Sequence, residues 1–299
     1  MNLKELIGAK KHLVLVGVTE PIEALIVKAA GFKAAYISGA ALSTKLGFLD
    51  EGLISLEKMV QVVSDIIKAS DLPLLVDCDT GLWSSDSEDF QKKESPEAQK
   101  EMAHAMMHLL ADAGADAVQI EDQAPAKKRC GHLSGKELVS MNDMFWKIKM
   151  LAYWRKNRDQ VIVARTDARA VEGLDGAIFR AHRYINAGAD AIFPEALESL
   201  EEFIEFRKAV DSVPLVANLT THGKTPSSIS AEHLFGAGYQ IVLLPVPQRI
   251  LFKKFEEILK EARHYGSLTA PVMRGEMSSR DQINDFIKKN SKVYKKTAG

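Results

Sequence analysis

The sequence predicts an α/β protein in which eight strands and the helices between them close into a (β/α)8 (TIM) barrel. Short apolar runs recur along the 299 residues, and segments with helical periodicity separate them. Four of these runs begin shortly after an Ala-Gly pair that ends a helical segment. The runs are continuous rather than alternating, as expected for parallel strands that are covered on both faces. This repeated unit, present eight times, predicts a closed parallel barrel.

The expected elements follow one another in regular order along the chain. The strands are expected at 13–18, 34–38, 74–76, 117–121, 161–164, 191–194, 215–217 and 241–245. The helices are expected at 21–29, 55–69, 96–111, 143–155, 174–186 and 197–209. Gly31, Gly114, Gly188 and Gly238 follow helix ends, where glycine readily adopts the left-handed conformation that turns the chain back. An open doubly wound sheet is the alternative, but the first turn at 17–21 has no GxGxxG loop.

The chain is expected to form one barrel domain over residues 1–299. Residues 281–299 remain after the eighth strand–helix unit as a C-terminal helical extension, which we expect either to pack on the barrel or to exchange onto a neighbouring subunit. The polar, acidic stretch 84–97 follows the third strand and is expected to be a loop at the end of the barrel that carries active sites.

Composition excludes several function classes. The formal net charge is −1, from 39 Lys and Arg and 40 Asp and Glu, and the basic residues are dispersed, so neither a nucleic-acid surface nor a membrane surface is expected. No apolar run approaches the roughly 18 residues of a membrane span. The N-terminus lacks the features of a signal peptide, and there are two cysteines. We therefore expect a cytoplasmic location.

Polar residues cluster where the expected strands end. They are Ser38, Asp77, Asp79, Glu121, Asp122, Arg165, Asp167, Glu195, Asn218 and Thr220. In a barrel these positions surround the active site. A ring of structural salt bridges is the alternative explanation. Burying one unpaired ion destabilises a protein by roughly several kcal/mol, so this many buried charges without a function are not expected.

A divalent metal is expected beside the third strand. Asp77 and Asp79 are two residues apart at its end, so both carboxylates can approach one hard cation. An open, oxygen-rich site suits Mg²⁺, with Mn²⁺ as a possible substitute. No His/Cys cluster has zinc spacing.

The loop after the fourth strand carries a cysteine among cations, in the run Lys128-Arg129-Cys130-Gly131-His132. Positive neighbours favour ionisation of a thiol and hence proton exchange near neutral pH. We expect Cys130 to act as an acid, carried on a loop that closes over the site. Two alternatives are a nucleophilic Cys130 with His132 as base and an incidental cysteine in a solvated loop. The pair His104 and His108 is weaker as a metal site because no third ligand accompanies it, and His222 is a further candidate for lining the site.

These motifs together resemble the isocitrate lyase and phosphoenolpyruvate mutase superfamily along nearly the whole chain. The matching runs are Tyr36-Ile37-Ser38-Gly39, Asp77-Cys78-Asp79-Thr80-Gly81, Ile120-Glu121-Asp122-Gln123, Arg165-Thr166-Asp167-Ala168, Phe193-Pro194-Glu195-Ala196 and Ala217-Asn218-Leu219-Thr220. The cysteine loop resembles the lyase branch, and its Lys-Arg-Cys-Gly-His form is similar to the 2-methylisocitrate lyase family. The resemblance implies cleavage of 2-methylisocitrate to pyruvate and succinate. It leaves open the same chemistry on 2,3-dimethylmalate or isocitrate, hydrolysis of an oxaloacetate-type acid, or a binder of dicarboxylates without activity.

The resemblance also implies roles for residues. Asp77 and Asp79 would hold Mg²⁺, mostly through waters, and the catalytic groups would be Cys130, His132, Arg165, Glu121 and Lys128. The substrate, a small di- or tricarboxylate, would contact Ser38, Gly39, Ala40, Asp50, Gly131, Arg165, Glu195, Asn218, Thr220 and Arg280. The resemblance further implies a homotetramer whose last helix is exchanged between subunits. The chain departs from the family pattern at Ala40, Leu49 and Trp83, and Arg249 is the nearest candidate for an arginine expected after the last strand.

Overall fold

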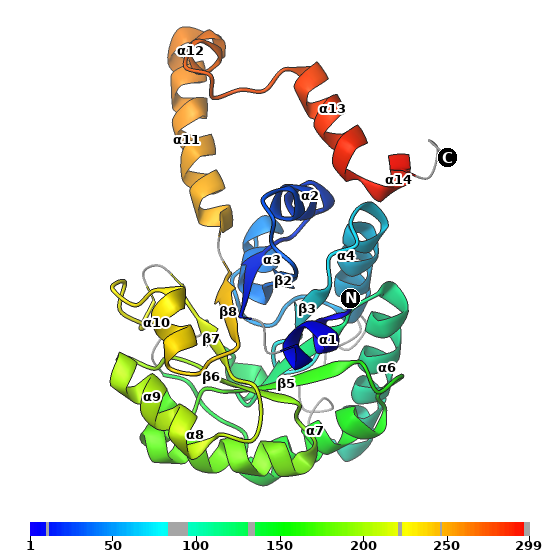
Figure 1. The fold of residues 1–299 in the computed structure, drawn as a ribbon, viewed down its shortest axis with the longest axis vertical. Coiled ribbons are helices and arrows are strands. Elements are labelled where there is room, and N and C mark those ends of the chain that lie inside the picture. Colours follow the sequence, from blue (N-terminus) through cyan, green and yellow to red (C-terminus); the bar gives the residue numbers. More distant parts are fainter. Residues whose placement is uncertain (10–11, 83–94, 131–134, 221–222, 246, 296–299) are drawn as a thin grey trace.

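The centre of the protein is an eight-stranded parallel barrel (Figure 1). The computed structural model describes residues 1–9, 12–82, 95–130, 135–220, 223–245 and 247–295. The strands are β1 (Leu13–Gly17), β2 (Ala35–Ile37), β3 (Leu74–Asp77), β4 (Ala117–Glu121), β5 (Val161–Thr166), β6 (Ala191–Pro194), β7 (Val216–Asn218) and β8 (Ile241–Leu244). They pair in the order β6-β5-β4-β3-β2-β1-β8-β7. A bridge between Ile192 and Leu215 joins the two end strands, and the N–H of Ile192 donates to the Pro214 carbonyl at 3.1 Å. The predicted barrel is confirmed.

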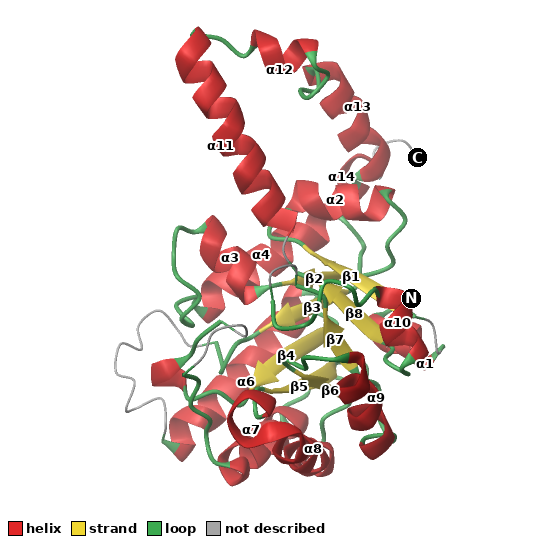
Figure 2. Ribbon diagram, turned by 90° about the vertical axis from the view of Figure 1, so that its left-hand side faces the viewer, coloured by secondary structure: helices red, strands yellow, loops and turns green. Residues whose placement is uncertain are grey.

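Helices surround the barrel and connect its strands (Figure 2). They are α1 (Leu3–Gly8), α2 (Pro21–Ala29), α3 (Gly39–Lys45), α4 (Leu56–Ala69), α6 (Pro96–Ala113), η1 (Pro125–Lys127), α7 (Met141–Tyr153), α8 (Arg169–Ala187), α9 (Leu200–Ala209) and α10 (Ala231–Gly236). The four glycines expected to end helices all have left-handed φ, from 91° to 112°. The main boundary difference is at α8, which begins five residues before the expected start because it continues across a kink at Gly173 (φ 79°). No described helix is both long and apolar enough to cross a membrane.

Two apolar cores lie on opposite faces of the strands. The outer core fills the space between the sheet and the helices, and it includes Met102, Met106 and Met107 of α6. The inner core fills the barrel with alternate residues of each strand, such as Leu75 and Phe193. Helix α1 closes the N-terminal end, where Leu3 and Leu6 join the inner core. The opposite end of the barrel is therefore the one that is open for a site.

The C-terminal helices form an arm that leaves the barrel. The arm consists of α11 (Pro247–Tyr265), α12 (Thr269–Met273), α13 (Arg280–Asn290) and α14 (Lys292–Lys295). Helix α11 projects away and has no buried residue, and the chain returns so that α13 contacts α2 and α14 contacts α4 (Figures 1 and 2). The expected extension is thus larger than residues 281–299, because the helix after the eighth strand also stands away from the barrel.

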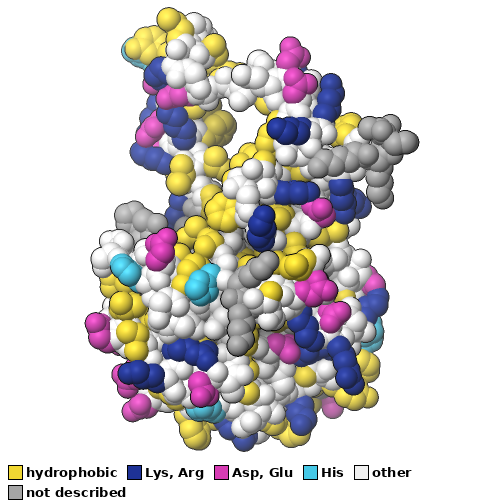
Figure 3. Space-filling model, viewed as in Figure 1, with side chains coloured by type: hydrophobic (Ala, Val, Ile, Leu, Met, Phe, Trp, Pro, Cys, Tyr) yellow, Lys and Arg dark blue, Asp and Glu magenta, His cyan; other side chains and the backbone are white. Residues whose placement is uncertain are grey.

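The arm exposes apolar side chains. Ile250, Leu251, Phe252, Phe255 and Leu259 of α11 are between 49% and 73% exposed. Hydrophobic side chains lie on the arm and on the barrel surface beside it, while positive and negative side chains are interspersed over the rest of this face (Figure 3).

Candidate active site

The period of the strands decides which polar side chains reach the open end of the barrel. Successive side chains alternate between the two faces of a strand. In β4, Ala117 belongs to the inner core, Gln119 is buried two residues later, and Glu121 follows at the end. In β5, Val161 and Val163 belong to the inner core and Arg165 continues the same face. Glu121 and Arg165 are therefore the last members of two of the rows that fill the barrel.

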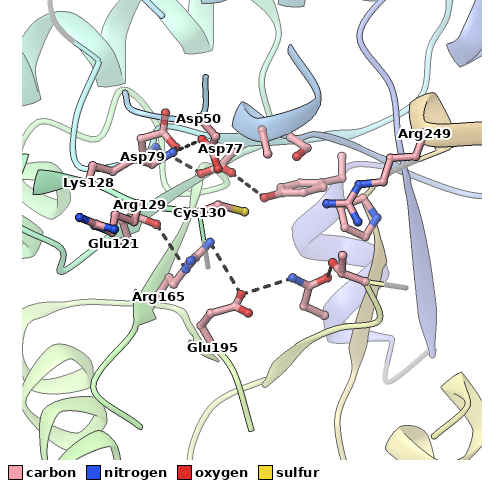
Figure 4. Close-up of a pocket in the computed structure, with 16 residues that line it drawn as sticks. Asp50, Asp77, Asp79, Glu121, Lys128, Arg129, Cys130, Arg165, Glu195 and Arg249 are labelled. Carbon is pink, nitrogen blue, oxygen red and sulfur yellow. Dashed lines mark hydrogen bonds and ion pairs between the residues drawn. The ribbon is translucent and has the colours of Figure 1, made fainter. Parts of the chain in front are cut away.

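Sixteen residues line one pocket at this end (Figure 4). They are Tyr36, Ser38, Ala40, Asp50, Asp77, Asp79, Glu121, Lys128, Arg129, Cys130, Arg165, Glu195, Asn218, Thr220, Pro245 and Arg249. The pocket encloses about 40 Å³, and an outer cavity of about 780 Å³ adjoins it. Asp50, Lys128, Arg129 and Cys130 line both. These four residues stand between the inner pocket and the outer cavity.

Most residues predicted for the site lie in this pocket, and a few lie elsewhere. Gly39 is beside it and donates its backbone N–H to Asp77 at 3.2 Å. Arg280 is exposed at the start of α13 and does not line the pocket. Gly131 and His132, together with Trp83 and His222, lie outside the described residues.

Asp77 is held rigidly by four donors. Its Oδ2 accepts from the Tyr36 hydroxyl at 2.8 Å and from the Gly39 N–H, and its Oδ1 accepts from Gln119 Nε2 at 2.9 Å and from the Asp79 N–H at 3.2 Å. A carboxylate offers about four lone-pair positions, so these donors use them all. An ion beside Asp77, whether it binds directly or through water, would therefore share the carboxylate oxygens with these donors.

Asp79 lies in a cluster that is rich in negative charge. It adopts a left-handed backbone conformation with φ 48°, which is uncommon outside glycine. Lys128 lies 2.8 Å from Asp79 and also pairs with Asp50. Burial, opposed by Lys128 and reinforced by Asp77 and Asp50, raises the pKa of Asp79 to about 6. The side chain of Lys128 thus provides the positive charge that this carboxylate requires.

The residues present fit a hydrated divalent cation. Among the described residues, no three acidic, His or Cys side chains converge as a complete metal site. Two carboxylates with water and substrate oxygens are a usual set for Mg²⁺, which keeps several waters. Asp77 and Asp79 would hold the ion, and Lys128 would have to give way or share Asp79 with it.

Replacing Gly39 by alanine is expected to weaken the grip of this cluster on a metal. A Cβ at Gly39 would lie 2.8 Å from Asp79 Oδ1, so the carboxylate must move. We expect lower affinity for Mn²⁺ in a calorimetric titration and a loss of stability of about 1–3 kcal/mol. In the control Gly236→Ala the Cβ meets nothing within 4 Å, so both properties should be kept. Unchanged metal affinity in Gly39→Ala would contradict the placement of the ion at Asp79.

Arg165 is the buried cation at the other side of the pocket. It binds Asp167 through two N–H groups at 2.9 and 3.0 Å, and it lies 3.3 Å from Glu121 and 3.7 Å from Glu195. Burial lowers its pKa, but these carboxylates outweigh that effect and raise the pKa well above its usual value. Its guanidinium also packs over the Phe193 ring at 5.4 Å. Arg165 is therefore a fixed positive charge that faces the pocket.

Asp122 faces away from the pocket, although it follows a strand end. It accepts from Thr166 at 2.7 Å, from Tyr184 at 2.8 Å and from the Asp167 N–H at 2.9 Å, and it lies 3.4 Å from Arg180. Asp122 is one residue beyond the inward-facing Glu121, so the strand period turns it toward the helices. It supports the site from outside the barrel.

Cys130 and the acidic pair share one pocket. The Cys130 side chain projects toward the middle of the pocket, with Asp77 and Asp79 on one side and Arg249 on the other (Figure 4). A single small ligand in this pocket would therefore lie near both the two aspartates and the thiol. This arrangement combines paired carboxylates, a guanidinium group held in place by buried carboxylates, and a thiol.

The model of the phosphoenolpyruvate phosphomutase family matches residues 3–263. The chain belongs to this family. It is 41% identical to a 2-methylisocitrate lyase of Aeropyrum pernix, with 98% of this chain and 91% of that protein covered. It is 39% identical to a 2-methylisocitrate lyase of Bacillus subtilis, with 96% and 88% covered.

A solved structure extends the family comparison to the fold. A 2,3-dimethylmalate lyase, described as a member of the PEP mutase/isocitrate lyase superfamily, superposes with a TM-score of 0.83 at 26% identity, covering 99% of this chain and 91% of that one. The predicted superfamily is confirmed, and so is the prediction of a carbon–carbon lyase.

Several pocket residues of this family member were not predicted from the sequence. They are Tyr36, Arg129 and Pro245, together with Gln119 and Gln123, which support the pocket from β4 and just after it. Gln119 is a polar residue in the middle of an apolar strand, which is a signal that could have been used. His104 and His108 lie on α6 and pack against Trp154, the residue that follows α7, and neither lines the pocket.

Proposed function

We propose that the protein cleaves 2-methylisocitrate to pyruvate and succinate in a Mg²⁺-dependent reaction in which Cys130 donates a proton to the leaving carbon. The observation that carries this proposal is the shared pocket of Cys130, Asp77, Asp79 and Arg165. The names of the relatives that are 39% and 41% identical support this choice of substrate.

The substrate would be held by cations and polar groups around the pocket. Arg165 and Arg249 line the pocket, as does Arg129, and we assign the first two guanidinium groups to its carboxylates. Thr220 donates to Asn218 at 2.6 Å, and Asn218 donates to Glu195 at 3.3 Å, so these three side chains form a preordered row. We assign substrate contacts to this row, to Ser38, Gly39, Ala40 and Asp50, and to Gly131. We also assign a substrate contact to Arg280, which lies on the exposed arm and does not line this pocket.

The metal would act at the α-hydroxy carboxylate. Bound by Asp77 and Asp79 with water, Mg²⁺ (or Mn²⁺ in its place) would supply a Lewis acid for the substrate oxygens. Glu121 lines the same pocket as the two aspartates. Burial, opposed by Arg165, raises the pKa of its carboxyl well above the usual value.

The proton and electron balance assigns a task to Cys130. A base removes the hydroxyl proton, the hydroxyl carbon becomes the keto carbon of pyruvate, and the carbon–carbon bond breaks. Its electron pair stays on the carbon that becomes part of succinate. The thiol of Cys130 gives its proton to that carbon, while Arg165 and Lys128 stabilise the developing negative charge by about a few kcal/mol per well-placed donor. We assign His132, two residues after Cys130 in the same basic loop, to the catalytic groups as well.

The direct test is to offer the Mg²⁺-loaded protein 2-methylisocitrate, isocitrate, 2,3-dimethylmalate and oxaloacetate and to identify the products. We expect pyruvate and succinate from the first acid, and we expect turnover to disappear with a chelator and to return with added Mg²⁺. Glyoxylate from isocitrate as the main product, or cleavage of 2,3-dimethylmalate or oxaloacetate alone, would replace the proposed substrate. Turnover that survives chelation would remove the metal from the proposal.

The exposed arm supports an assembly of several copies. We propose a homotetramer in which α11 and the following helices exchange between subunits. The proposal is supported by the five exposed apolar residues of α11, which soluble monomers rarely expose together.

A further inference from the structure

The chain just before Cys130 is held in place by the buried side-chain amide of Gln123. Gln123 is fully buried; its Oε1 accepts from the Arg129 N–H at 3.0 Å, and its Nε2 donates to the Arg129 carbonyl at 2.9 Å. The same Nε2 lies 3.2 Å from Glu121 Oε1. The residue directly before Cys130 is therefore fixed to the floor of the pocket.

After Cys130, the chain is held in place again by a buried ion pair between Lys136 and Asp167. Lys136 lies six residues after Cys130 in the sequence, and residues 131–134 between them are outside the described part. Its ammonium group pairs with Asp167, and the two side chains are 1% and 0% exposed. Asp167 is the same carboxylate that binds Arg165 through two hydrogen bonds. One carboxylate thus joins the Cys130 segment to the guanidinium in the pocket.

A simple structural anchor does not require this buried lysine. The backbone after it already pairs with the chain after β4, because the Ala124 N–H donates to the Glu137 carbonyl at 2.8 Å and the Val139 N–H donates to the Asp122 carbonyl at 2.9 Å. Burying two charges costs about several kcal/mol in desolvation, on the order of what their attraction returns, so two apolar side chains in place of the pair would serve equally well for stability alone. The ion pair is better explained by its effect on Asp167 and Arg165.

Lys136 affects both the charge balance around Asp167 and the position of Arg165. Burial would raise the pKa of Asp167, but Arg165 and Lys136 outweigh burial and lower it. Arg165 also faces Glu121 and Glu195, so three carboxylates compete for one guanidinium. With Lys136 on Asp167, more of the positive charge of Arg165 is left for a ligand in the pocket.

We propose that Lys136 is a positioning residue that couples the Cys130 segment to Arg165 through their shared partner Asp167. The ion pair between Lys136 and Asp167 holds the Cys130 thiol and the Arg165 guanidinium in a fixed relative position. The catalytic consequence rests on the proposed lyase function, whereas the coupling itself does not.

The test compares Lys136→Met and Lys136→Arg with the control Lys127→Met. Lys127 belongs to the same region and pairs with Glu137 at 2.6 Å, but both side chains are more than half exposed. We expect Lys136→Met to lower kcat for 2-methylisocitrate by roughly 10- to 100-fold, because small displacements of reacting groups cost rates of this order. KM should rise by a smaller factor, because less of the positive charge of Arg165 is left for the substrate. Lys136→Arg should restore most of kcat, and Lys127→Met should resemble the wild type.

A second readout does not depend on activity. The rate of alkylation of Cys130 by iodoacetamide, followed by peptide mass spectrometry, should rise severalfold in Lys136→Met, and the buried Cys78 provides an internal reference. An alkylation rate equal to or below that of the wild type, or a kcat equal to that of the wild type, would overturn the proposal. So would a kcat that Lys136→Arg fails to restore.

Two further outcomes are separated by design. If Lys136→Met does not fold, Lys136→Gln, which keeps a donor to Asp167 without the charge, takes its place with the same criteria. If the wild type does not cleave 2-methylisocitrate, the proposed function fails, and the alkylation rates alone decide whether Lys136 controls the position of Cys130.

Discussion

Cys130→Ser is expected to lower kcat for 2-methylisocitrate by roughly 10²- to 10⁴-fold, the usual contribution of a positioned general acid. Serine is close to cysteine in shape, but its hydroxyl is a far weaker acid than a thiol, so it delivers a proton to carbon much more slowly. Asp77 and Asp79, rather than Cys130, are the residues proposed to hold Mg²⁺. Affinity for Mg²⁺, measured by calorimetry, should therefore stay at the wild-type value.

The other cysteine offers a matched control. Cys78 lies in the outer core and contacts the Val76 carbonyl at 3.6 Å, a contact that a serine hydroxyl can also make. Cys78→Ser should keep kcat within a few-fold of the wild type, with only a modest loss of stability. Near-normal turnover in Cys130→Ser would eliminate the thiol as the proton donor.

Arg165→Met is expected to have the largest effect on stability, a loss of about 3–5 kcal/mol, because it leaves buried carboxylates without their partner. Asp167, Glu121 and Glu195 are each at most 2% exposed. KM should also rise, since a cation facing the substrate is gone. Chemical unfolding and steady-state kinetics measure the two effects separately.

The pH dependence of this loss has a definite sign. Burial raises the pKa of Glu121 and Arg165 opposes that rise, so without Arg165 this carboxyl binds protons still more readily in the folded protein than in the unfolded chain. A raised carboxyl pKa makes the folded state less favourable as pH rises above the unfolded value. The stability difference between Arg165→Met and the wild type should therefore be larger in mildly alkaline than in mildly acidic buffer.

A nearby arginine provides the comparison for Arg165. Arg169 pairs with Glu202 at 2.7 Å and with Glu198 at 3.1 Å, and these side chains are 22% to 43% exposed. Because such pairs contribute about 0–1 kcal/mol, Arg169→Met should cost little. Equal losses in the two variants would show that Arg165 does not bear the role assigned to it.

Local patterns in the sequence were enough to place the barrel elements. The strands 117–121 and 191–194 and the helix 21–29 were predicted with the boundaries that the structure has. Apolar runs of strand length and helix-ending glycines are local properties, so neighbouring residues suffice to recognise them. No bounds were predicted for helices α1, α3, α10, α11 and α12. Of these, α1, α3, α10 and α12 are five to seven residues long, and periodicity over so few positions is hard to recognise.

The pocket was predicted as a set of strand ends, and its supporting contacts were not. Eight of the ten predicted strand-end residues line it because parallel strands bring their carboxyl ends to one side of a barrel, a rule that needs only the order of the strands. The basic loop pointed to Lys128 and Cys130, and the family resemblance pointed to Ala40 and Asp50. Lys136 was missed because its partner Asp167 is 31 positions away, and only the closed barrel brings them together.

The sequence by itself determined the strand and helix order, the end of the barrel that carries polar groups, and the pairing of two aspartates with a cysteine set among cations. The tertiary structure decided that Asp122 faces the helices while Glu121 faces the pocket, that Lys128 lies between Asp79 and Asp50, and that the helix after the eighth strand leaves the barrel. The physical reason is range. Periodicity and turn chemistry act between neighbours in the chain, whereas buried charges choose their partners among all the groups that folding brings within a few ångströms.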